Sequence, residues 1–377
     1  MYAFVSHESA CAALRLLSSS GLGMEGLNRW PAAARRLPPV TECVSGQRDF
    51  RRDADAALVG VGVTDRPIDL LVPERRARSS GKTARFHLWS RVIPAGSMLE
   101  VGPGLLISGP ELIIAQLCGA QGKLDALLDA HVDAVRAEVR ALADFGLDER
   151  PVVDHPLEWE RIRRLVAAVT VACEFAGTYR LGRMGEEATY RLRPITNIDS
   201  LRRVIAQTGE PQGTQRALHA CELALEGAAS PLETSLALML TLPVDYGGFG
   251  LEKPLLNCPV DVSRSRGGVS DRDVVTPDFL WVAARVALEY DSAAYHDRAG
   301  KGRREEDAVR ANILAALGYR VLRATPGVIR SLAGVSLLAR QLACALGCEL
   351  AVPTPVQDLR RRKLYVQLMP RFERDGT

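Results

Sequence analysis

Four acidic residues in the C-terminal half of the chain could gather around one divalent metal ion. They are Glu233, Asp278, Glu289 and Asp291, and His296 follows them. Carboxylate oxygens are ligands that Mg²⁺ prefers, and converging carboxylates repel one another until a cation relieves the repulsion. Such a cation lowers the pKa of a bound water and polarises a phosphate oxygen. These residue types therefore predict hydrolysis of phosphodiester bonds.

Two predicted strands decide which of these acids meet. Residues 274–281 and 285–291 read as strands joined by a tight turn, and this hairpin brings Asp278 close to Glu289. Glu289 and Asp291 share a face because side chains two positions apart point the same way. Solvated acids beside a turn are the alternative. The apolar run before them instead indicates a buried central strand, which rarely ends in acids without reason.

The other candidates have structural explanations beside catalytic ones. Residues 230–233 fit a helix start with a capping box, which by itself explains Glu233. His296 could orient a phosphate or transfer a proton, or lie on the surface after a turn. Arg310 could contact phosphate, or it could pair with the acids at 306–307 on an exposed helical face.

A basic run near the end of the chain could neutralise the phosphates of a nucleic acid. It consists of Arg360, Arg361, Arg362 and Lys363. Binding through this run would weaken with salt, and a solvated surface is the alternative. The net charge of +3 does not by itself mark a nucleic-acid binder, so a basic surface must come from local clustering.

Composition places the chain among soluble globular proteins. It has 377 residues, with 47% hydrophobic and 25% charged, which allows two domains. No apolar run reaches the ~18 residues of a membrane span, and the first residues do not resemble a signal peptide. The eight cysteines never form Cys-x-x-Cys, so we expect neither a structural zinc site nor disulfides, and a cytoplasmic location.

Hydrophobic periodicity predicts an α+β N-terminal module over residues 1–195, followed by a helical connector over 196–229 that breaks at 209–213. In the module, the predicted helices are 8–18, 110–117, 122–146 and 157–176, and the predicted strands are 57–61, 68–72 and 85–89.

Residues 230–330 are predicted to form a second, α/β domain. Its expected order is α-β-β-β-α-β with a mixed sheet. The elements are helices at 230–242 and 304–317, and strands at 255–260, 274–281, 285–291 and 319–324. Residues 331–377 are expected to form a helix around 332–346 and a basic tail packed on this domain.

Residues 230–325 resemble the very-short-patch-repair (Vsr)-like branch of the restriction-endonuclease-like PD-(D/E)XK superfamily. The likeness rests on Ser230-Pro231-x-Glu233-Thr234, Pro277-Asp278-Phe279, Glu289-Tyr290-Asp291-Ser292 with His296, Asp307-x-x-Arg310-x-Asn312, and Leu317-Gly318-Tyr319-x-Val321. The resemblance implies a DNA endonuclease in which Asp278 and Glu289 bind Mg²⁺ or Mn²⁺. It also implies that Glu233, Asp291 and His296 lie nearby.

One position departs from that superfamily's pattern. The usual lysine, two positions after the second acid, is Asp291 here. This leaves open which group activates water. The rival prediction is a non-catalytic regulator with a degenerate nuclease fold that binds nucleic acid or a partner protein, and a nuclease acting on RNA is a third possibility.

The N-terminal part resembles the C-terminal domain of AbiEi-type antitoxin regulators of type IV toxin–antitoxin systems. The likeness rests on Val5-Ser6-His7-Glu8-Ser9-Ala10, Phe86-His87-Leu88-Trp89, and Ile107-Ser108-Gly109-Pro110-Glu111 before an apolar helix with Gln116. It implies a toxin–antitoxin, defence or repair setting, with a toxin–antitoxin partner protein.

Overall fold

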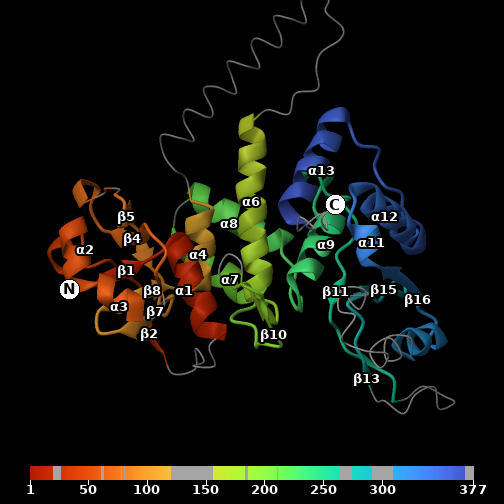
Figure 1. The fold of residues 1–377 in the computed structure, drawn as a ribbon, viewed down its shortest axis with the longest axis horizontal. Coiled ribbons are helices and arrows are strands. Elements are labelled where there is room, and N and C mark those ends of the chain that lie inside the picture. Colours follow the sequence, from red (N-terminus) through yellow and green to blue (C-terminus); the bar gives the residue numbers. More distant parts are fainter. Residues whose placement is uncertain are drawn as a thin grey trace, which may run out of the picture. The chain divides into compact units, whose positions relative to one another are not determined.

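The computed structural model describes residues 1–19, 27–60, 63–77, 79, 81–119, 156–182, 186–209, 211–263, 274–290 and 309–369. They form a mixed α/β fold with mixed sheets, which confirms the predicted fold class at this level (Figure 1). The described residues within Met1–Leu127 and Arg164–Ala224 make one compact unit, and those within Leu128–Arg163 and Leu225–Thr377 make a second. In the described part of the chain, no helix is both long and apolar enough to cross a membrane.

A six-stranded mixed sheet forms the centre of the first unit. Its strand order is β2-β7-β8-β1-β4-β5. The central strand β1 pairs in parallel with β8 and antiparallel with β4, and β4 pairs in parallel with the edge strand β5. The strands are β1 (Ala3–Val5), β2 (Asn28–Trp30), β4 (Ile68–Val72), β5 (Ala84–Leu88), β7 (Met98–Gly102) and β8 (Leu105–Ser108).

Helices close the core on this sheet (Figure 1). In α1 the predicted apolar face is confirmed, because Ala10, Ala13 and Leu14 are buried against β4 and β8. The helices of the unit are α1 (His7–Ser19), α2 (Gln47–Asp53), α3 (Asp55–Gly60), α4 (Pro110–Leu117), the part of α6 (Pro156–Phe175) from residue 164 onward, α7 (Ile198–Ile205) and α8 (Pro211–Leu223). Short ribbons pair β3 (Arg35–Arg36) with β6 (Val92–Ile93), and β9 (Tyr179–Arg180) with β10 (Thr189–Tyr190).

One predicted strand of the first unit is wrong. Residues 57–60 belong to the helix α3 rather than to a strand. A short apolar run does not distinguish the two structures by periodicity, and Asp55 in the first turn favours a helix through the helix dipole. The strand predicted at 68–72 is confirmed, and β5 begins one residue earlier than predicted. The predicted helix at 122–146 lies outside the described residues.

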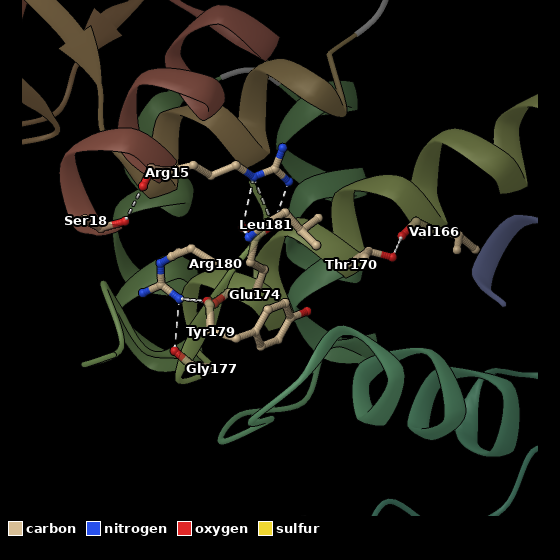
Figure 2. A network of polar contacts seen from close by, with 9 residues as sticks. All are labelled: Arg15, Ser18, Val166, Thr170, Glu174, Gly177, Tyr179, Arg180 and Leu181. Carbon is tan, nitrogen blue, oxygen red and sulfur yellow. Dashed lines mark hydrogen bonds and ion pairs between the residues drawn. The ribbon is translucent and has the colours of Figure 1, made fainter. Parts of the chain in front are cut away.

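Charged side chains fix the end of α6 to its surroundings (Figure 2). Arg15 from α1 donates from Nη2 to Oε2 of Glu174 over 2.6 Å, and the Glu174 Oε1 accepts the backbone N–H of Leu181 at 3.0 Å. The buried Arg180 donates to the carbonyl oxygens of Glu174 at 2.6 Å and Gly177 at 3.1 Å. These bonds satisfy carbonyl groups that a helix end leaves without partners.

The predicted connector is helical, with a break at Gly209, whose φ is +73°. Asn197 caps α7 by accepting the backbone N–H of Ser200 at 2.8 Å. Both α7 and α8 group with the first unit by compactness. The division of the chain into a module, a connector, a nuclease-like domain and a tail stays a prediction.

A four-stranded mixed sheet forms the centre of the second unit, in the order β11-β14-β15-β16. The first three strands are antiparallel neighbours, and β16 runs parallel to β15. The elements that build this part are α9 (Pro231–Thr241), β11 (Leu255–Leu256), β14 (Phe279–Trp281), β15 (Val286–Tyr290) and β16 (Arg320–Ala324). The buried Trp281 donates its indole N–H to the carbonyl of Glu252 at 2.8 Å, which ties β14 to the loop after α9.

Two predicted strands of the second unit are each divided by a proline. The strand predicted at 274–281 is two strands, β13 (Val274–Val275) and β14, separated at Pro277. The strand predicted at 255–260 is divided at Pro259 into β11 and β12 (Val260–Asp261), which pairs with β13 in a separate ribbon. Proline lacks the N–H that a strand ladder needs.

The described part of the predicted helix 304–317 is helical from 309 to 316, and Gly318 follows it with φ +81°. Three more helices follow in the described residues up to 369: α11 (Pro326–Ile329), α12 (Leu332–Leu346), which confirms its prediction, and α13 (Pro355–Leu368). Residues 355–368 of the predicted basic tail form the helix α13. Thr354 and Gln357 make a capping box at its start, a signal that the sequence carries.

Candidate active site

The register of the β14–β15 hairpin brings Asp278 beside Glu289, as predicted. Phe279 pairs with Leu288, so the positions next to them in the two strands are also neighbours. The backbone N–H of Tyr290 donates to Oδ2 of Asp278 at 2.6 Å, which fixes the carboxyl against β15. Asp278 is partly buried and Glu289 is 5% exposed, so both acids lie largely out of solvent.

The start of α9 holds Glu233 by several hydrogen bonds. Ser230 is the cap residue, and its Oγ accepts the N–H of Glu233 at 3.1 Å, which confirms the predicted helix start. The Glu233 carboxylate accepts the N–H of Ala229 at 2.9 Å and the Oγ–H of Ser230 at 3.0 Å. The predicted capping box placed this carboxylate on the N–H of Ser230 itself, and the observed partner precedes that residue by one position.

Asn257 is a residue of this site that the sequence analysis missed. It follows β11 in a left-handed backbone conformation with φ +47°, which asparagine tolerates better than most residues. Its Nδ2 donates to Oε2 of Glu233 at 2.7 Å and to the carbonyl of Gly227 at 3.0 Å. Its backbone N–H donates to the carbonyl of Asp278 at 3.0 Å, so Asn257 links α9 to β14.

Arg310 neutralises Glu289 through a two-pronged ion pair. Its Nε lies 3.0 Å and 3.1 Å from the two carboxylate oxygens, and its Nη2 lies 2.5 Å from Oε2. Arg310 comes from the helix at 309–316 and its side chain is 25% exposed. The acids at 306–307, the alternative partners of Arg310, lie outside the described residues.

The electrostatics of Asp278 show that the three acids lie near one another. Burial first, and then the negative charges of Glu233 and Glu289, raise the pKa of its carboxyl to about 7. The N–H of Tyr290 and the charge of Arg310 oppose this change without cancelling it. Burial also raises the pKa of Glu233, against its three hydrogen bonds. The cluster therefore places like charges near a desolvated carboxyl, which keeps Asp278 protonated up to about neutral pH.

Two of the predicted site residues, Asp291 and His296, lie outside the described residues. Within the part of the chain that the structure describes, no group of three or more His, Cys, Asp or Glu side chains could hold a metal ion. Asp278 and Glu289 fit a hard divalent cation by donor type, as two carboxylates that supply oxygen ligands. Both oxygens of Glu289, however, already contact Arg310.

The four residues of the predicted basic run lie on α13 and contact their own unit. Arg361 is buried, and its guanidinium lies 4.3 Å from the centre of the Phe249 ring. Arg360 bonds to Glu158 at 2.6 Å, and Arg361 donates to the carbonyl of Gly248 at 3.1 Å. Arg362 bonds to Asp358 at 2.9 Å, and the Lys363 ammonium lies 5.3 Å from the centre of the Trp159 ring. Only Arg362 has a mainly exposed side chain among the ion-paired members, at 69%. Contact of this run with nucleic acid stays a prediction.

The segments behind the N-terminal resemblance meet in a polar cluster of the first unit. The rings of His7 and His87 stack with their centres 4.0 Å apart. The N–H of His7 donates to Oε1 of Gln116 at 2.9 Å, and Nε2 of His87 lies 2.8 Å from Oδ1 of the buried Asp69. A cavity of ≈ 250 Å³, lined in part by Asp69 and Arg85, lies beside this cluster.

Arg85 and His87 both contact Oδ1 of Asp69. Burial alone would raise the pKa of its carboxyl, but the hydrogen bond and charge of His87, followed by the charges of His7 and Arg85, hold that pKa below its usual value. Ser9 Oγ also donates to Oδ2 of Asp69 at 3.2 Å. Burial and the neighbouring His87 lower the pKa of His7 to about 3. The Asp69 cluster is therefore internally compensated.

Comparisons of the chain with protein-family models, with curated proteins and with solved structures find no match. The two family resemblances therefore stay predictions.

Proposed function

We propose that the second unit hydrolyses phosphodiester bonds in DNA, with Mg²⁺ or Mn²⁺ as its cofactor. The observation that carries this proposal is the hairpin register that sets the Asp278 carboxyl beside Glu289, with Glu233 close enough to raise the pKa of Asp278. A protein that holds like charges together at this cost has a site suited to a cation. The order α9–β11–β14–β15–helix–β16 and its mixed sheet support a restriction-endonuclease-like domain.

Each acid has a different role in this proposal. Asp278 and Glu289 supply the carboxylate oxygens, while Glu233, held by Asn257 and the cap of α9, contributes negative charge near Asp278. Arg310 keeps Glu289 in place. The bound cation would lower the pKa of the attacking water and polarise a phosphate oxygen. Near neutral pH, Asp278 would lose its proton when its carboxylate binds the cation.

Hydrolysis adds the oxygen of one water to phosphorus and breaks one phosphorus–oxygen bond to a sugar. One water proton leaves to solvent or a base, and the departing sugar oxygen takes up a proton. Asp291 and His296 remain the proposed groups for placing water and contacting phosphate, on the basis of the resemblance alone.

The rival proposal is a non-catalytic nucleic-acid-binding regulator or toxin–antitoxin component with a degenerate nuclease fold. The observation that favours it is the two-pronged contact of Arg310, which provides Glu289 with a cation from the protein itself. This rival predicts DNA binding that needs no metal and survives loss of the acids.

The test is cleavage of plasmid, linear duplex and single-stranded DNA, and of RNA, with Mg²⁺, Mn²⁺ or EDTA. Wild type is compared with Asp278→Asn and with Glu349→Gln, which removes an exposed acid elsewhere in the same unit. We expect metal-dependent cutting of DNA by wild type and Glu349→Gln, and its loss in Asp278→Asn. Cutting by Asp278→Asn at the wild-type rate would reject the proposed site. Cutting of RNA alone would change the substrate, and metal-free binding without any cutting would favour the rival.

A further inference from the structure

One exposed arginine lies beside the acid cluster and is absent from the predicted basic run. Strand β16 pairs in parallel with β15, and Arg323 is the registered partner of Glu289. Neighbouring strands lie about 4.8 Å apart, so the backbones of these two residues are adjacent. Arg323 is exposed, and within the described part of the chain no ion pair or hydrogen bond holds its side chain.

The face of the sheet decides where the Arg323 side chain points. Ala287 and Val321, two positions before Glu289 and Arg323, pack in one core cluster with Leu314 of the helix at 309–316. Because side chains two positions apart share a face, Glu289 and Arg323 lie on that same face of the sheet. Arg323 therefore projects beside the acids, next to the end of the covering helix.

The neighbouring Arg320 provides a contrast on the same strand. It is also exposed, but it is three positions away and so points to the opposite face. Its registered partner is Val286 rather than an acid of the cluster. Arg320 and Arg323 are thus both exposed arginines of β16, but their side chains point to opposite faces of the sheet.

We propose that Arg323 contacts a backbone phosphate of the nucleic acid that the second unit binds, an inference that rests on the proposed function. A polyanion approaching three carboxylates meets repulsion, and a cation beside the cluster anchors a phosphate there. Among the described residues the guanidinium of Arg323 has its donors available, whereas that of Arg310 contacts Glu289 and those of α13 contact their own unit. Arginine is suited to phosphate by its fork of donors.

The test measures binding apart from cleavage. Fluorescence anisotropy follows binding of labelled duplex DNA to the full chain in EDTA, over a series of salt concentrations, in an Asp278→Asn background. We compare Arg323→Gln, Arg323→Lys and Arg320→Gln. Arg323→Gln should weaken binding about tenfold, the size of one charge-assisted hydrogen bond. It should also lower the salt slope by about 0.9, the value for one lost phosphate contact.

The controls separate a contact from general charge. Arg323→Lys should recover most of the salt slope, and Arg320→Gln should remain close to its parent. Equal losses in Arg323→Gln and Arg320→Gln would overturn the proposal, because only net charge would then matter. Unchanged binding in Arg323→Gln, with DNA bound and cut by wild type, would reject the Arg323 contact alone. If wild type neither binds nor cuts nucleic acid, the proposed function and this contact fall together.

Discussion

The two units each hold a buried or partly buried aspartate, and the two carboxyls respond in opposite ways. Asp69 in the first unit has its pKa lowered by His87, His7 and Arg85, although burial acts against this. Asp278 in the second unit has its pKa raised to about 7, by burial and by two acids. The sign of the neighbouring charges therefore decides whether the pKa of a desolvated carboxyl falls, as at Asp69, or rises, as at Asp278. In the second case a bound cation would stabilise the ionised form.

The largest expected loss of stability comes from removing the Asp69 carboxylate from its cluster in the first unit. Asp69→Ala should destabilise the first unit by about 3 kcal/mol, because it removes the buried carboxyl bonded to Ser9, Arg85 and His87, at about 1 kcal/mol for each hydrogen bond. Urea unfolding would measure this loss, with hydrogen exchange of β4 and β5 to locate it. A change below about 0.5 kcal/mol, the usual size for surface sites, would mean that the Asp69 network carries no stability.

Arg310→Gln tests the compensated part of the second unit. Glu289 would remain buried without its counter-charge, so we expect a loss of about 3 kcal/mol in the free energy of unfolding. The same urea experiment serves as the measurement, with the double variant Arg310→Gln/Glu289→Gln as control. If the double variant is not more stable than the single one, the unpaired charge is not the cause.

The two aspartates also predict different pH dependences. The raised pKa of Asp278 means that the folded state binds this proton more tightly than the unfolded chain does. Its stabilising effect is therefore complete below about pH 4 and is lost as pH rises to about 7. The lowered pKa of Asp69 gives the reverse: stability present above about pH 4, lost as pH falls below its folded value.

Thermal unfolding of wild type and Asp278→Asn between pH 4 and pH 8 would measure this. The difference between their unfolding temperatures should change across that window, because wild type loses stability relative to the variant as pH rises. An asparagine carries no charge and still offers an oxygen to the N–H of Tyr290, so it should be as stable as wild type or more so at pH 8. Parallel pH curves would contradict the raised pKa of Asp278.

The smallest expected stability effect is at Asn257. Asn257→Ala removes the amide donor on Glu233 and should cost about 1 kcal/mol, the usual value of a hydrogen bond. Urea unfolding at pH 7 is the measurement. Asn257→Gly is its matched control, because glycine also lacks the amide but accepts the positive φ without strain. Equal stability of wild type and both variants would show that the bond to Glu233 contributes nothing.

Much of the second unit could be predicted from the sequence because local signals agree with the fold there. The cap and proline of α9, the apolar run of β15 and the helix at 332–346 each have one consistent interpretation. The tight turn predicted between the two strands set the hairpin register, and it correctly placed Asp278 beside Glu289. Acids that close adjacent strands are therefore accessible to sequence reasoning.

Contacts between segments distant in the chain could not be predicted in this way. Asn257 reaches Glu233 through a left-handed backbone, and no periodic pattern marks such a residue. The misassigned residues 57–60 form an apolar run short enough for either a helix or a strand, and in the helix α3 Leu58 packs in the core of the first unit. The partners of the α13 arginines, such as Glu158, lie far away in sequence.

The position of Trp281 gives the second unit an optical label of its own. It ends the short strand that begins directly after Asp278, and its indole is buried with its N–H bound to Glu252. The emission wavelength of an indole shifts with the polarity around it, so a movement of β14 would alter the fluorescence of this ring. With the other three tryptophans replaced by phenylalanine, titration of the full chain with Mg²⁺ or with DNA would report on this strand directly.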